Sequence, residues 1–296
     1  MRLMSKILII GGDNRNLYLA KKLYRMGCDV SSLYIDNSVC ASDNGNASEI
    51  INKAKLIVLP LPCTPDGINI NTPLCNSGIG LNILYSSIAP DAIVFGGKLD
   101  IFAFESRGIT AYDYAARDDF AALNAVPTAE GAIEAVMKML PVTICGCKAL
   151  ITGFGKISKV LSQVLRHLGA DVTVAARKTS DLAMAEALGY KSVRISDMHS
   201  ALKEADIIFN TVPHRIFGEK ELDSIAAGVP FADLASMPGG TDPQAAEQKN
   251  INYVFLPGIP GKYSPASAAD IILKTIENII AESGKDAKLW IYGKKE

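Results

Sequence analysis

Two glycines and a serine stand at the spacing Gly-x-Gly-x-x-Ser, as Gly153, Gly155 and Ser158, between an apolar run and a helical pattern. In such a turn the first glycine allows a tight reversal, and the second lets the backbone approach a pyrophosphate. The helix that follows offers its N-terminal amides to the phosphate. Ser158 replaces a third glycine with another small residue, which still allows close packing of helix on strand. The segment predicts a dinucleotide-binding turn made of Gly153, Phe154, Gly155, Lys156 and Ile157.

The end of the next predicted strand, about 20 residues further on, indicates which cofactor is used. An NAD site places Asp or Glu there to accept hydrogen bonds from the ribose 2′-hydroxyl. Here the strand ends VAARK at 174–178, with no acid. Arg177, Lys178 and Ser180 could hold a 2′-phosphate, and arginine binds phosphate in bidentate fashion. We expect NADP rather than NAD, the alternative being that both cations are solvated surface charges.

Two later strand ends supply further residues to the same crevice, because ligands of doubly wound sheets bind beyond the carboxyl ends of the strands. Thr211, Val212 and Pro213 follow one predicted strand, and Ala235 follows another. Each segment alone is also an ordinary turn by composition. Together they are predicted to contact the cofactor.

The elements that would position these residues alternate between strand-like and helix-like runs, which is typical of parallel sheets with crossover helices. In the first half the strand-like runs are 6–12, 29–35, 56–62, 91–97 and 109–115. In the second half they are 148–155, 171–177, 191–195, 206–213, 230–236 and 251–258. The pattern predicts an α/β protein with two Rossmann-like, doubly wound parallel-sheet domains and a cleft between them.

The predicted domain boundaries follow from this repeat. Residues 1–126 would form a flavodoxin-like substrate domain, and 127–263 a Rossmann NAD(P)-binding domain. A helix with apolar residues at helical spacing would link the two. The last helix, 264–284, carries an apolar stripe and ends at Gly284, so we expect it to pack back on the first domain and complete it.

Composition excludes several classes of protein. A chain of 296 residues, 49% hydrophobic, suits two domains. A net charge of −1 without a Lys/Arg-rich tract argues against nucleic-acid or membrane surfaces, and no apolar run reaches about 18 residues. The six cysteines show no CxxC and no paired His/Cys spacing, so neither disulfides nor a metal site is expected. We expect a cytoplasmic protein that acts on small molecules.

Several motifs together resemble the A subunits of dipicolinate synthases, over nearly the whole chain. The most specific are DLASMPGGTD at 233–242 and LPGIPGKYSP at 256–265, accompanied by GGDNRN at 11–16 and NAVPTAEGAI at 124–133. A broader similarity links the chain to alanine and hydroxyacid dehydrogenases, which share a two-domain plan. The resemblance implies NAD(P)-dependent oxidation of a dihydrodipicolinate, derived from a lysine-pathway intermediate, to dipicolinate for spores. It also implies that the B subunit of dipicolinate synthase is the partner, and we expect a homo-oligomer.

Such a substrate is a small ring with two carboxylates, so two anion-binding groups are required. Arg15, Lys98 and Lys262 lie near predicted strand ends, and arginine is the natural bidentate partner of a carboxylate. Arg15 is preferred, because it follows a glycine turn at the start of a helix whose amides would face the same anion. Tyr114 and Ser236 could donate hydrogen bonds to the substrate. For each cation the alternative is an exposed, salt-bridged side chain.

Aromatising the ring also removes a proton, which requires a general base near the nicotinamide. His214, at a strand end, is the one histidine predicted to lie near the cofactor, and Asp13 and Asp113 are the other candidates. No pattern matches the Arg/Glu/His triad of hydroxyacid dehydrogenases, so that mechanism is not transferred. Two other functions stay open: another imino- or amino-acid dehydrogenase, and a non-catalytic NADP-binding scaffold.

Overall fold

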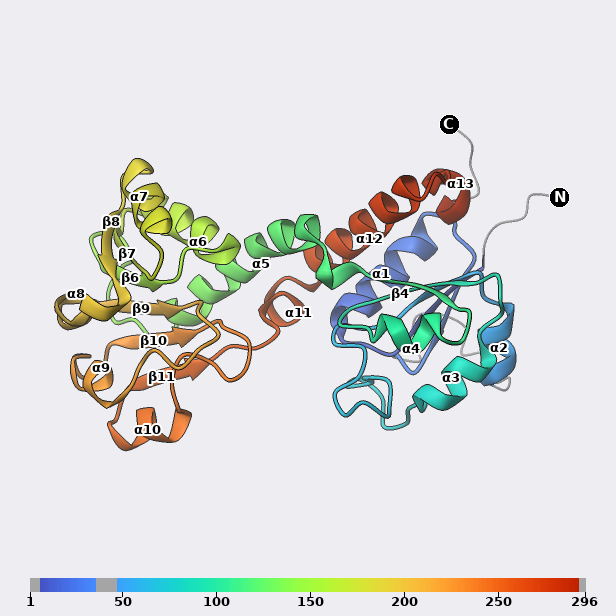
Figure 1. Cartoon of the computed structure of the whole chain (residues 1–296), viewed down its shortest axis with the longest axis horizontal. Coiled ribbons are helices and arrows are strands. Elements are labelled where there is room, and N and C mark those ends of the chain that lie inside the picture. Colours follow the sequence, from blue (N-terminus) through green and yellow to red (C-terminus); the bar gives the residue numbers. More distant parts are fainter. Residues whose placement is uncertain (1–5, 36–46, 293–296) are drawn as a thin grey trace. The chain divides into compact units, whose positions relative to one another are not determined.

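The structure is a computed structural model that describes residues 6–35 and 47–292 of the chain. The chain divides into two compact units, shown in Figure 1: a first unit of residues 1–123 and 264–296, and a second unit of residues 124–263. Helix α5 (Asp118–Met137) begins in the first unit and ends in the second. The predicted boundary between 126 and 127 falls inside this helix.

The first unit is a five-stranded, all-parallel sheet in the order β2-β1-β3-β4-β5, which confirms the predicted fold class. Its strands are β1 (Ile7–Ile10), β2 (Val30–Leu33), β3 (Leu56–Val58), β4 (Ile93–Gly96) and β5 (Thr110–Asp113). Its helices are α1 (Asn14–Arg25), α2 (Ala47–Lys53), α3 (Leu81–Ser87), α4 (Ile101–Glu105), the 3₁₀ turn η1 (Tyr114–Ala116), α12 (Pro265–Glu282) and α13 (Ala287–Tyr292).

Side chains of β1 alternate between two cores, as the two-residue period of a strand requires. Ile7 and Ile9 pack among residues of α1 and α12, whereas Leu8 and Ile10 pack among residues of α2, α3 and α4. Figure 1 shows the same arrangement, with helices on both faces of the sheet. A strand buried on both faces reads as a continuous apolar run, which is why this strand could be predicted from ILII.

The last long helix belongs to the first unit, as predicted. Ile272, Ile276 and Ile279 of α12 are buried with Leu19 and Leu23 of α1. The first turn of α12 begins with a proline, whose missing N–H does no harm there, and the helix ends at Glu282, just before the predicted glycine stop.

An ion-pair network also joins this helix to the start of α5. Arg117 donates to Asp119 and, with two nitrogens at 2.8 Å each, to Glu282. Hydrogen bonds to Glu282 and then to Asp119 raise the pKa of Arg117 above its usual value. The guanidinium therefore serves the fold of the first unit.

The second unit is a six-stranded, all-parallel Rossmann sheet in the order β11-β10-β9-β6-β7-β8. Its strands are β6 (Lys148–Thr152), β7 (Asp171–Ala176), β8 (Lys191–Arg194), β9 (Ile207–Asn210), β10 (Pro230–Asp233) and β11 (Asn252–Phe255). Its helices are α6 (Lys156–His167), α7 (Thr179–Ala187), η2 (Ile195–Asp197), α8 (His199–Glu204), α9 (Glu219–Asp223), α10 (Pro243–Gln248) and α11 (Ile259–Tyr263). The strand order reverses between β6 and β9, which is where such a sheet opens a crevice.

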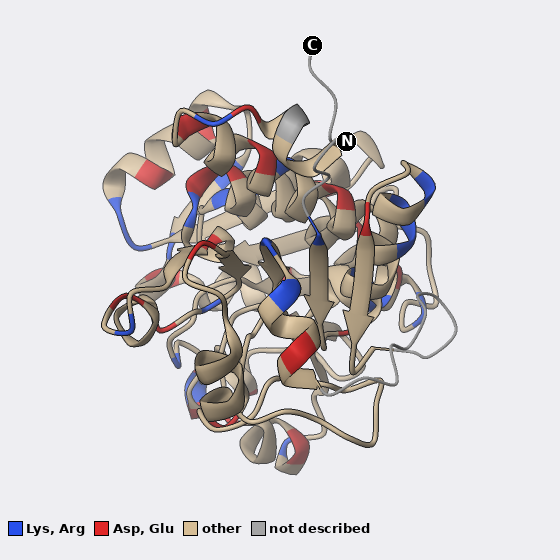
Figure 2. Cartoon of the chain, turned by 90° about the vertical axis from the view of Figure 1, so that its right-hand side faces the viewer, with Lys and Arg blue, Asp and Glu red and all other residues tan. Residues whose placement is uncertain are grey.

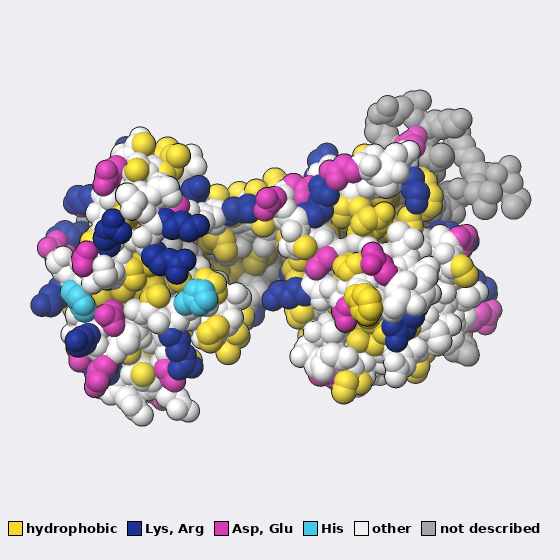
Figure 3. Space-filling view, in the orientation of Figure 1, with side chains coloured by type: hydrophobic (Ala, Val, Ile, Leu, Met, Phe, Trp, Pro, Cys, Tyr) yellow, Lys and Arg dark blue, Asp and Glu magenta, His cyan; other side chains and the backbone are white. Residues whose placement is uncertain are grey.

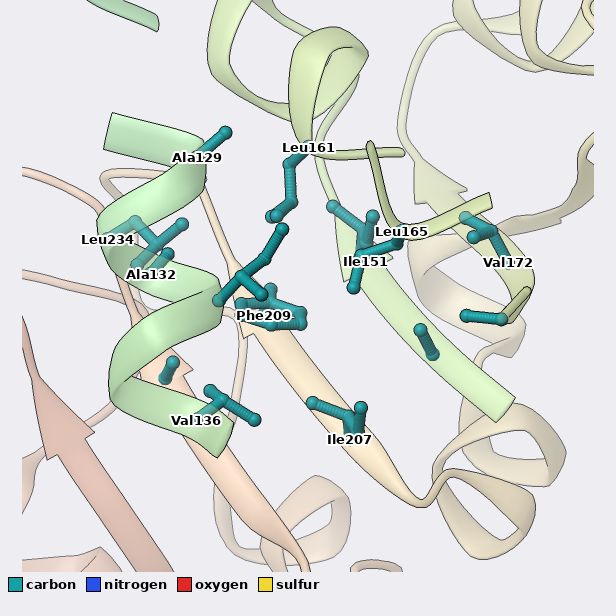
Figure 4. Close-up of a cluster of buried hydrophobic side chains, with 14 of the residues drawn as sticks. Ala129, Ala132, Val136, Ile151, Leu161, Leu165, Val172, Ile207, Phe209 and Leu234 are labelled. Carbon is teal, nitrogen blue, oxygen red and sulfur yellow. The ribbon is translucent and has the colours of Figure 1, made fainter. Parts of the chain in front are cut away.

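One core of this unit lies between the sheet and helices α5 and α6. Figure 4 shows Phe209 of β9 at the centre, between Val136 of α5 and Leu161 of α6, with Ile151 of β6 beside them. Phe209 has no exposed surface, and truncating such a phenylalanine costs about 3–5 kcal/mol. This core fixes the strand ends of β6 and β9 from which the candidate site is built.

Candidate functional site

The turn between β6 and α6 has the geometry that a pyrophosphate needs. Gly153 has φ +86°, and a Cβ there would lie 2.6 Å from Oγ1 of Thr211, so only glycine fits. Gly155 has an ordinary extended backbone, yet a Cβ there would meet no atom within 4 Å. Its backbone therefore borders open space at the start of α6. Ser158 is fully buried, and its Oγ donates to the carbonyl oxygen of Gly155 at 3.2 Å.

The other predicted residues of this turn differ in what they offer. The side chain of Phe154 is buried in the core, edge-on to Tyr190, so only its backbone can reach a ligand. Ile157 packs against the same core. Lys156 is exposed as the first residue of α6. Backbone amides and one lysine, rather than apolar side chains, are thus presented at the turn.

A pocket of about 530 Å³ opens next to this turn. Its apolar wall is formed by Ile195, Val212 and Ile216, with Ala176 and Gly153. Its polar residues are Arg177, Lys178, Arg194, Asp181, Ser196 and His214. In Figure 3, Lys, Arg and His side chains surround hydrophobic side chains on the face of this unit that is turned to the viewer. An apolar wall with a cationic rim suits an adenosine that carries a phosphate.

Arg194 is a pocket residue that the sequence reasoning missed. It ends β8 and lies directly opposite Ala176 of β7 in the parallel register, so it stands beside Arg177. Its Nη2 donates to Oγ1 of Thr179 at 3.2 Å. The signal was available, because a parallel neighbour strand must end level with VAARK, and KSVR ends in a cation.

The remaining predicted cofactor residues lie at the same edge of the sheet. Thr211 bonds through both its amide and its hydroxyl to the carbonyl oxygen of Thr152, while Pro213 is exposed. Ala235 is buried two residues after the end of β10, and Ser180 is exposed in the first turn of α7. Of these four residues none lines the pocket, and their cofactor contacts stay predictions.

His214 lies near the expected cofactor, at the end where the adenosine is expected. Its exposed imidazole lines the pocket together with Arg177 and Arg194, where the strand ends of β7 and β8 are expected to hold the adenosine. A general base must reach the nicotinamide end instead. The position of His214 does not support the predicted catalytic role.

In the first unit, Asp13 and Arg15 pair with each other. Asp13 caps α1 by accepting from the amide of Arg15, and its carboxylate also takes Nε and Nη2 of that guanidinium at 2.9 Å each. Nη2 donates further to the carbonyl oxygen of Leu61, in the loop after β3, at 2.5 Å. Arg15 is only 7% exposed. It ties two loops together, so its donors are already engaged within the fold, and the predicted grip on a substrate carboxylate stays a prediction.

Asp113 and Tyr114 also serve the fold of the first unit. The carboxylate of Asp113 accepts from four backbone amides, those of Lys98 and Leu99 after β4 and those of Ala115 and Ala116. Tyr114 is fully buried and donates to a backbone carbonyl 3.2 Å away, and burial raises its pKa. A hydroxyl sealed in the core cannot donate to a substrate, so this prediction is corrected.

The other predicted substrate residues are exposed. Lys98 stands directly after Gly97 with φ +56°, a conformation that non-glycine residues rarely adopt, and its amide is held by Asp113. Ser236 lies in the loop after β10, and Lys262 lies in the short helix α11. Their contacts with a substrate stay predictions.

Metal and membrane sites find no support within residues 6–35 and 47–292. These residues contain no group of three or more His, Cys, Asp and Glu that could hold a metal ion. No helix among them is long and apolar enough to cross a membrane. Acidic and basic residues are interspersed along the ribbon in Figure 2.

Comparisons with known proteins give a match for each of the two units. Residues 6–115 match the family model of the dipicolinate synthase A subunit N-terminal domain, and residues 120–235 match the NAD binding domain of D-isomer specific 2-hydroxyacid dehydrogenases. The dipicolinate synthase A subunit of Bacillus subtilis (strain 168) is 29% identical over 94% of this chain and 96% of that protein.

Solved structures extend the comparison to the fold. The crystal structure of the dipicolinate synthase A subunit from Bacillus halodurans has a TM-score of 0.83 at 27% identity, covering 95% of this chain and 99% of that one. The apo-structure of D-lactate dehydrogenase from Escherichia coli has a TM-score of 0.60 at 16% identity, covering 95% and 98%. The second likeness concerns the fold alone.

Proposed function

We propose that the chain is a dipicolinate synthase A subunit and that it oxidises a dihydrodipicolinate to dipicolinate with a nicotinamide cofactor, because it is similar to such subunits over nearly its whole length. The single observation that carries the redox role is the second unit, an NAD-binding domain of the hydroxyacid dehydrogenase type with an open glycine turn. When bound, the cofactor accepts the hydride that the substrate ring loses. The ring also releases one proton, which completes its aromatisation.

The cofactor is NADP in this proposal. Arg177, Lys178 and Arg194 line one pocket, and a 2′-phosphate would bring the negative charge that they attract. Helix α7 begins next to them with Lys178 at its N-cap position, and the positive end of the helix dipole would favour the same phosphate. Asp181 is the one carboxylate that lines this pocket, three residues along the chain from Lys178. The three cations give the lining of the pocket a net positive charge despite this carboxylate.

The protein's own residues bind the adenosine end by stacking and charge. Ile195, Val212 and Ile216 offer an apolar surface to the adenine, and His214 stands beside them. We therefore reassign His214 from proton transfer to adenosine binding.

Lys98 binds a substrate carboxylate in this proposal. Lys98 is exposed at a strand end, and Asp113 holds its backbone in one conformation, which reduces the entropy that binding costs. Arg15 orders the neighbouring loop through Asp13 and Leu61. The substrate contacts of Lys262 and Ser236 stay predictions.

The partner in this proposal is the dipicolinate synthase B subunit, since the similarity to an A subunit implies a second kind of chain. A homo-oligomer and a cytoplasmic location accompany the proposal.

The experiment is to follow dipicolinate absorbance and NADPH formation together, with the purified chain, freshly made dihydrodipicolinate and NADP⁺. Each assay is run with and without the B subunit. One NADPH per dipicolinate supports the proposed reaction. Binding of NADPH without any product, even when the partner chain is present, would favour the scaffold role instead.

A further inference from the structure

A buried carboxylate stands at the end of β10. Asp233 has no exposed surface, and its oxygens accept four hydrogen bonds. The donors are Nδ2 of Asn210 at 2.8 Å, the amide of Ala235 at 3.1 Å, the amide of Gly240 at 2.7 Å and the hydroxyl of Tyr253 at 3.2 Å. All four donors are neutral. Burying a carboxylate among neutral donors is expensive, so such a group calls for an explanation.

Asn210 extends this cluster to the neighbouring strand ends. It is also fully buried, and its Oδ1 accepts from the hydroxyl of Thr152 at 2.6 Å and from the amide of Val212 at 3.0 Å. Its Nδ2 donates to the carbonyl oxygen of Val212 as well as to Asp233. Thr152 directly precedes Gly153. The two side chains thus link the ends of β6, β9 and β10, which lie at the point where the strand order reverses.

The loop after β10 is fastened at both of its ends to the same carboxylate. The amide of Ala235 bonds to Oδ1 of Asp233, and the amide of Gly240 bonds to Oδ2. The loop returns so closely that a Cβ on Gly240 would lie 2.3 Å from Nδ2 of Asn210. A Cβ on Gly239, which has φ +80°, would lie 2.9 Å from Oδ2 of Asp233. Glycine is needed at both positions.

The tip of this loop faces outward. Ser236, Met237 and Pro238 are exposed, and Met237 is 75% exposed although it is a large apolar residue. An apolar side chain held out on a loop with fixed ends is suited to contact a ligand ring.

The place of β10 in the sheet tells which end of a dinucleotide this tip would meet. The pocket with the cationic rim lies at β7 and β8, on one side of the reversal between β6 and β9. A dinucleotide lies across that crevice, so its other end extends over β9 and β10. The other end carries the nicotinamide.

We propose that Asp233 and Asn210 are positioning residues: they hold the three loops at 153–155, 211–213 and 235–240 in one arrangement and aim the Ser236–Pro238 tip at the nicotinamide ring. This inference rests on the proposed dehydrogenase function, because it assumes a dinucleotide on the second unit. Rigid loops hold the ring in the geometry for transfer, where a displacement of about 1 Å can lower the rate about 100-fold.

The test is Asp233→Asn in the full-length chain, which keeps the size of the side chain but sets an amide group against the amide of Gly240. Asp242→Asn is the matched control, because Asp242 caps α10 on the surface and asparagine caps equally well. Gly240→Ala is a second variant, which displaces the loop base without touching the carboxylate.

Three readouts are compared. Hydrogen exchange of the backbone amides at 234–241 reports on the loop without any turnover. We expect this exchange to be at least about tenfold faster in Asp233→Asn and in Gly240→Ala, because losing the hydrogen bond between the Gly240 amide and the Asp233 side chain opens the loop. NADPH binding, followed by nicotinamide fluorescence, should stay within about threefold in Kd, because the phosphate-binding residues are unchanged. The kcat per NADPH-binding site should fall about 100-fold.

The control should match wild type in all three readouts. Unchanged exchange and kcat in Asp233→Asn would overturn the inference, as would an equal loss in Asp242→Asn. If Asp233→Asn does not fold, Gly240→Ala decides by the same criteria. A wild-type chain that binds NADPH but forms no dipicolinate would instead contradict the proposed function. The hydrogen-exchange rates would still test whether Asp233 holds the loop at 234–241.

Discussion

Both units are all-parallel α/β sheets with different strand orders, and they use the polar residues at their strand ends in opposite ways. In the first unit Asp13, Arg15 and Asp113 are occupied in tying loops to each other. In the second unit the ends of β7 and β8 leave Arg177 and Arg194 around a pocket. The difference teaches that a polar residue at a strand end indicates a ligand site only when its hydrogen bonds within the protein leave the side chain free to contact a ligand.

The second unit contains both kinds of residue, side by side. The side chains of Asn210 and Asp233 are hydrogen-bonded to neighbouring strand ends and loops, whereas the backbone of Gly155, a few residues from Thr152, borders open space. Residues that shape a site and residues that touch a ligand therefore need different tests, stability for the first kind and affinity for the second.

The largest expected effect separates these two kinds of residue within one turn. Gly155→Ala should weaken NADPH binding about 30-fold or more, about 2 kcal/mol, because its methyl group fills the space of the pyrophosphate. Its extended backbone suits alanine, so thermal unfolding should not change. Gly153→Ala should instead destabilise the fold by about 1–3 kcal/mol, since φ is +86° and Thr211 is too close. Fluorescence titration and calorimetry check the pair; a Gly155→Ala protein with wild-type affinity would break the comparison.

The next effect contrasts two cations of the first unit. Arg15→Ala should lower the free energy of unfolding by about 2 kcal/mol, because Asp13 and the carbonyl of Leu61 lose a charged donor in a largely buried place. Lys98→Ala should leave stability unchanged and lower kcat/KM for the substrate about tenfold. Urea denaturation and initial rates give both numbers. Equal unfolding of Arg15→Ala and wild type would return Arg15 to the role of a free carboxylate clamp.

A smaller effect tests the cationic rim. Arg194→Ala should weaken NADPH about tenfold and leave NADH almost unchanged, because only NADPH carries the 2′-phosphate. Lys203→Ala removes a cation from α8, outside the pocket, and should change neither cofactor. The loss should shrink as salt is added. Equal weakening of both cofactors would mean that Arg194 acts on the fold.

These contrasts also explain how far the sequence could be interpreted. Apolar runs such as ILII and ALIT predicted the strands of both sheets, because strands buried on both faces leave a continuous apolar signal. Gly153 and Ser158 could be predicted as well, since their roles depend on neighbours close in sequence. Arg194 was missed, because the cation that ends KSVR points to this site only once β8 is known to lie beside β7. Tyr114 was misassigned because burial at a strand end leaves no mark in a single sequence.

The smallest effect concerns the loop that Arg15 holds, after β3. Burial raises the pKa of Cys63 to about 12, whereas the hydrogen bond with Ser77 lowers that of Cys75. Peptide-resolved alkylation at pH 8 should therefore modify Cys75 well before Cys63. In the unfolded chain the Cys63 thiol loses its proton at about pH 8.5, whereas in the folded chain it keeps the proton up to about pH 12. The free energy of unfolding should therefore decline as pH rises from about 9 toward 12. Early labelling of Cys63 would show that the loop is open.

The most direct test of the account is a titration of the wild-type chain with NADPH and with NADH at the same ionic strength, followed by nicotinamide fluorescence. Three cations around one pocket and no acid at the end of β7 predict that NADPH binds at least about tenfold more tightly, about 1.4 kcal/mol. Equal dissociation constants, or tighter binding of NADH, would contradict the assignment of Arg177, Lys178 and Arg194 as the phosphate site of the second unit.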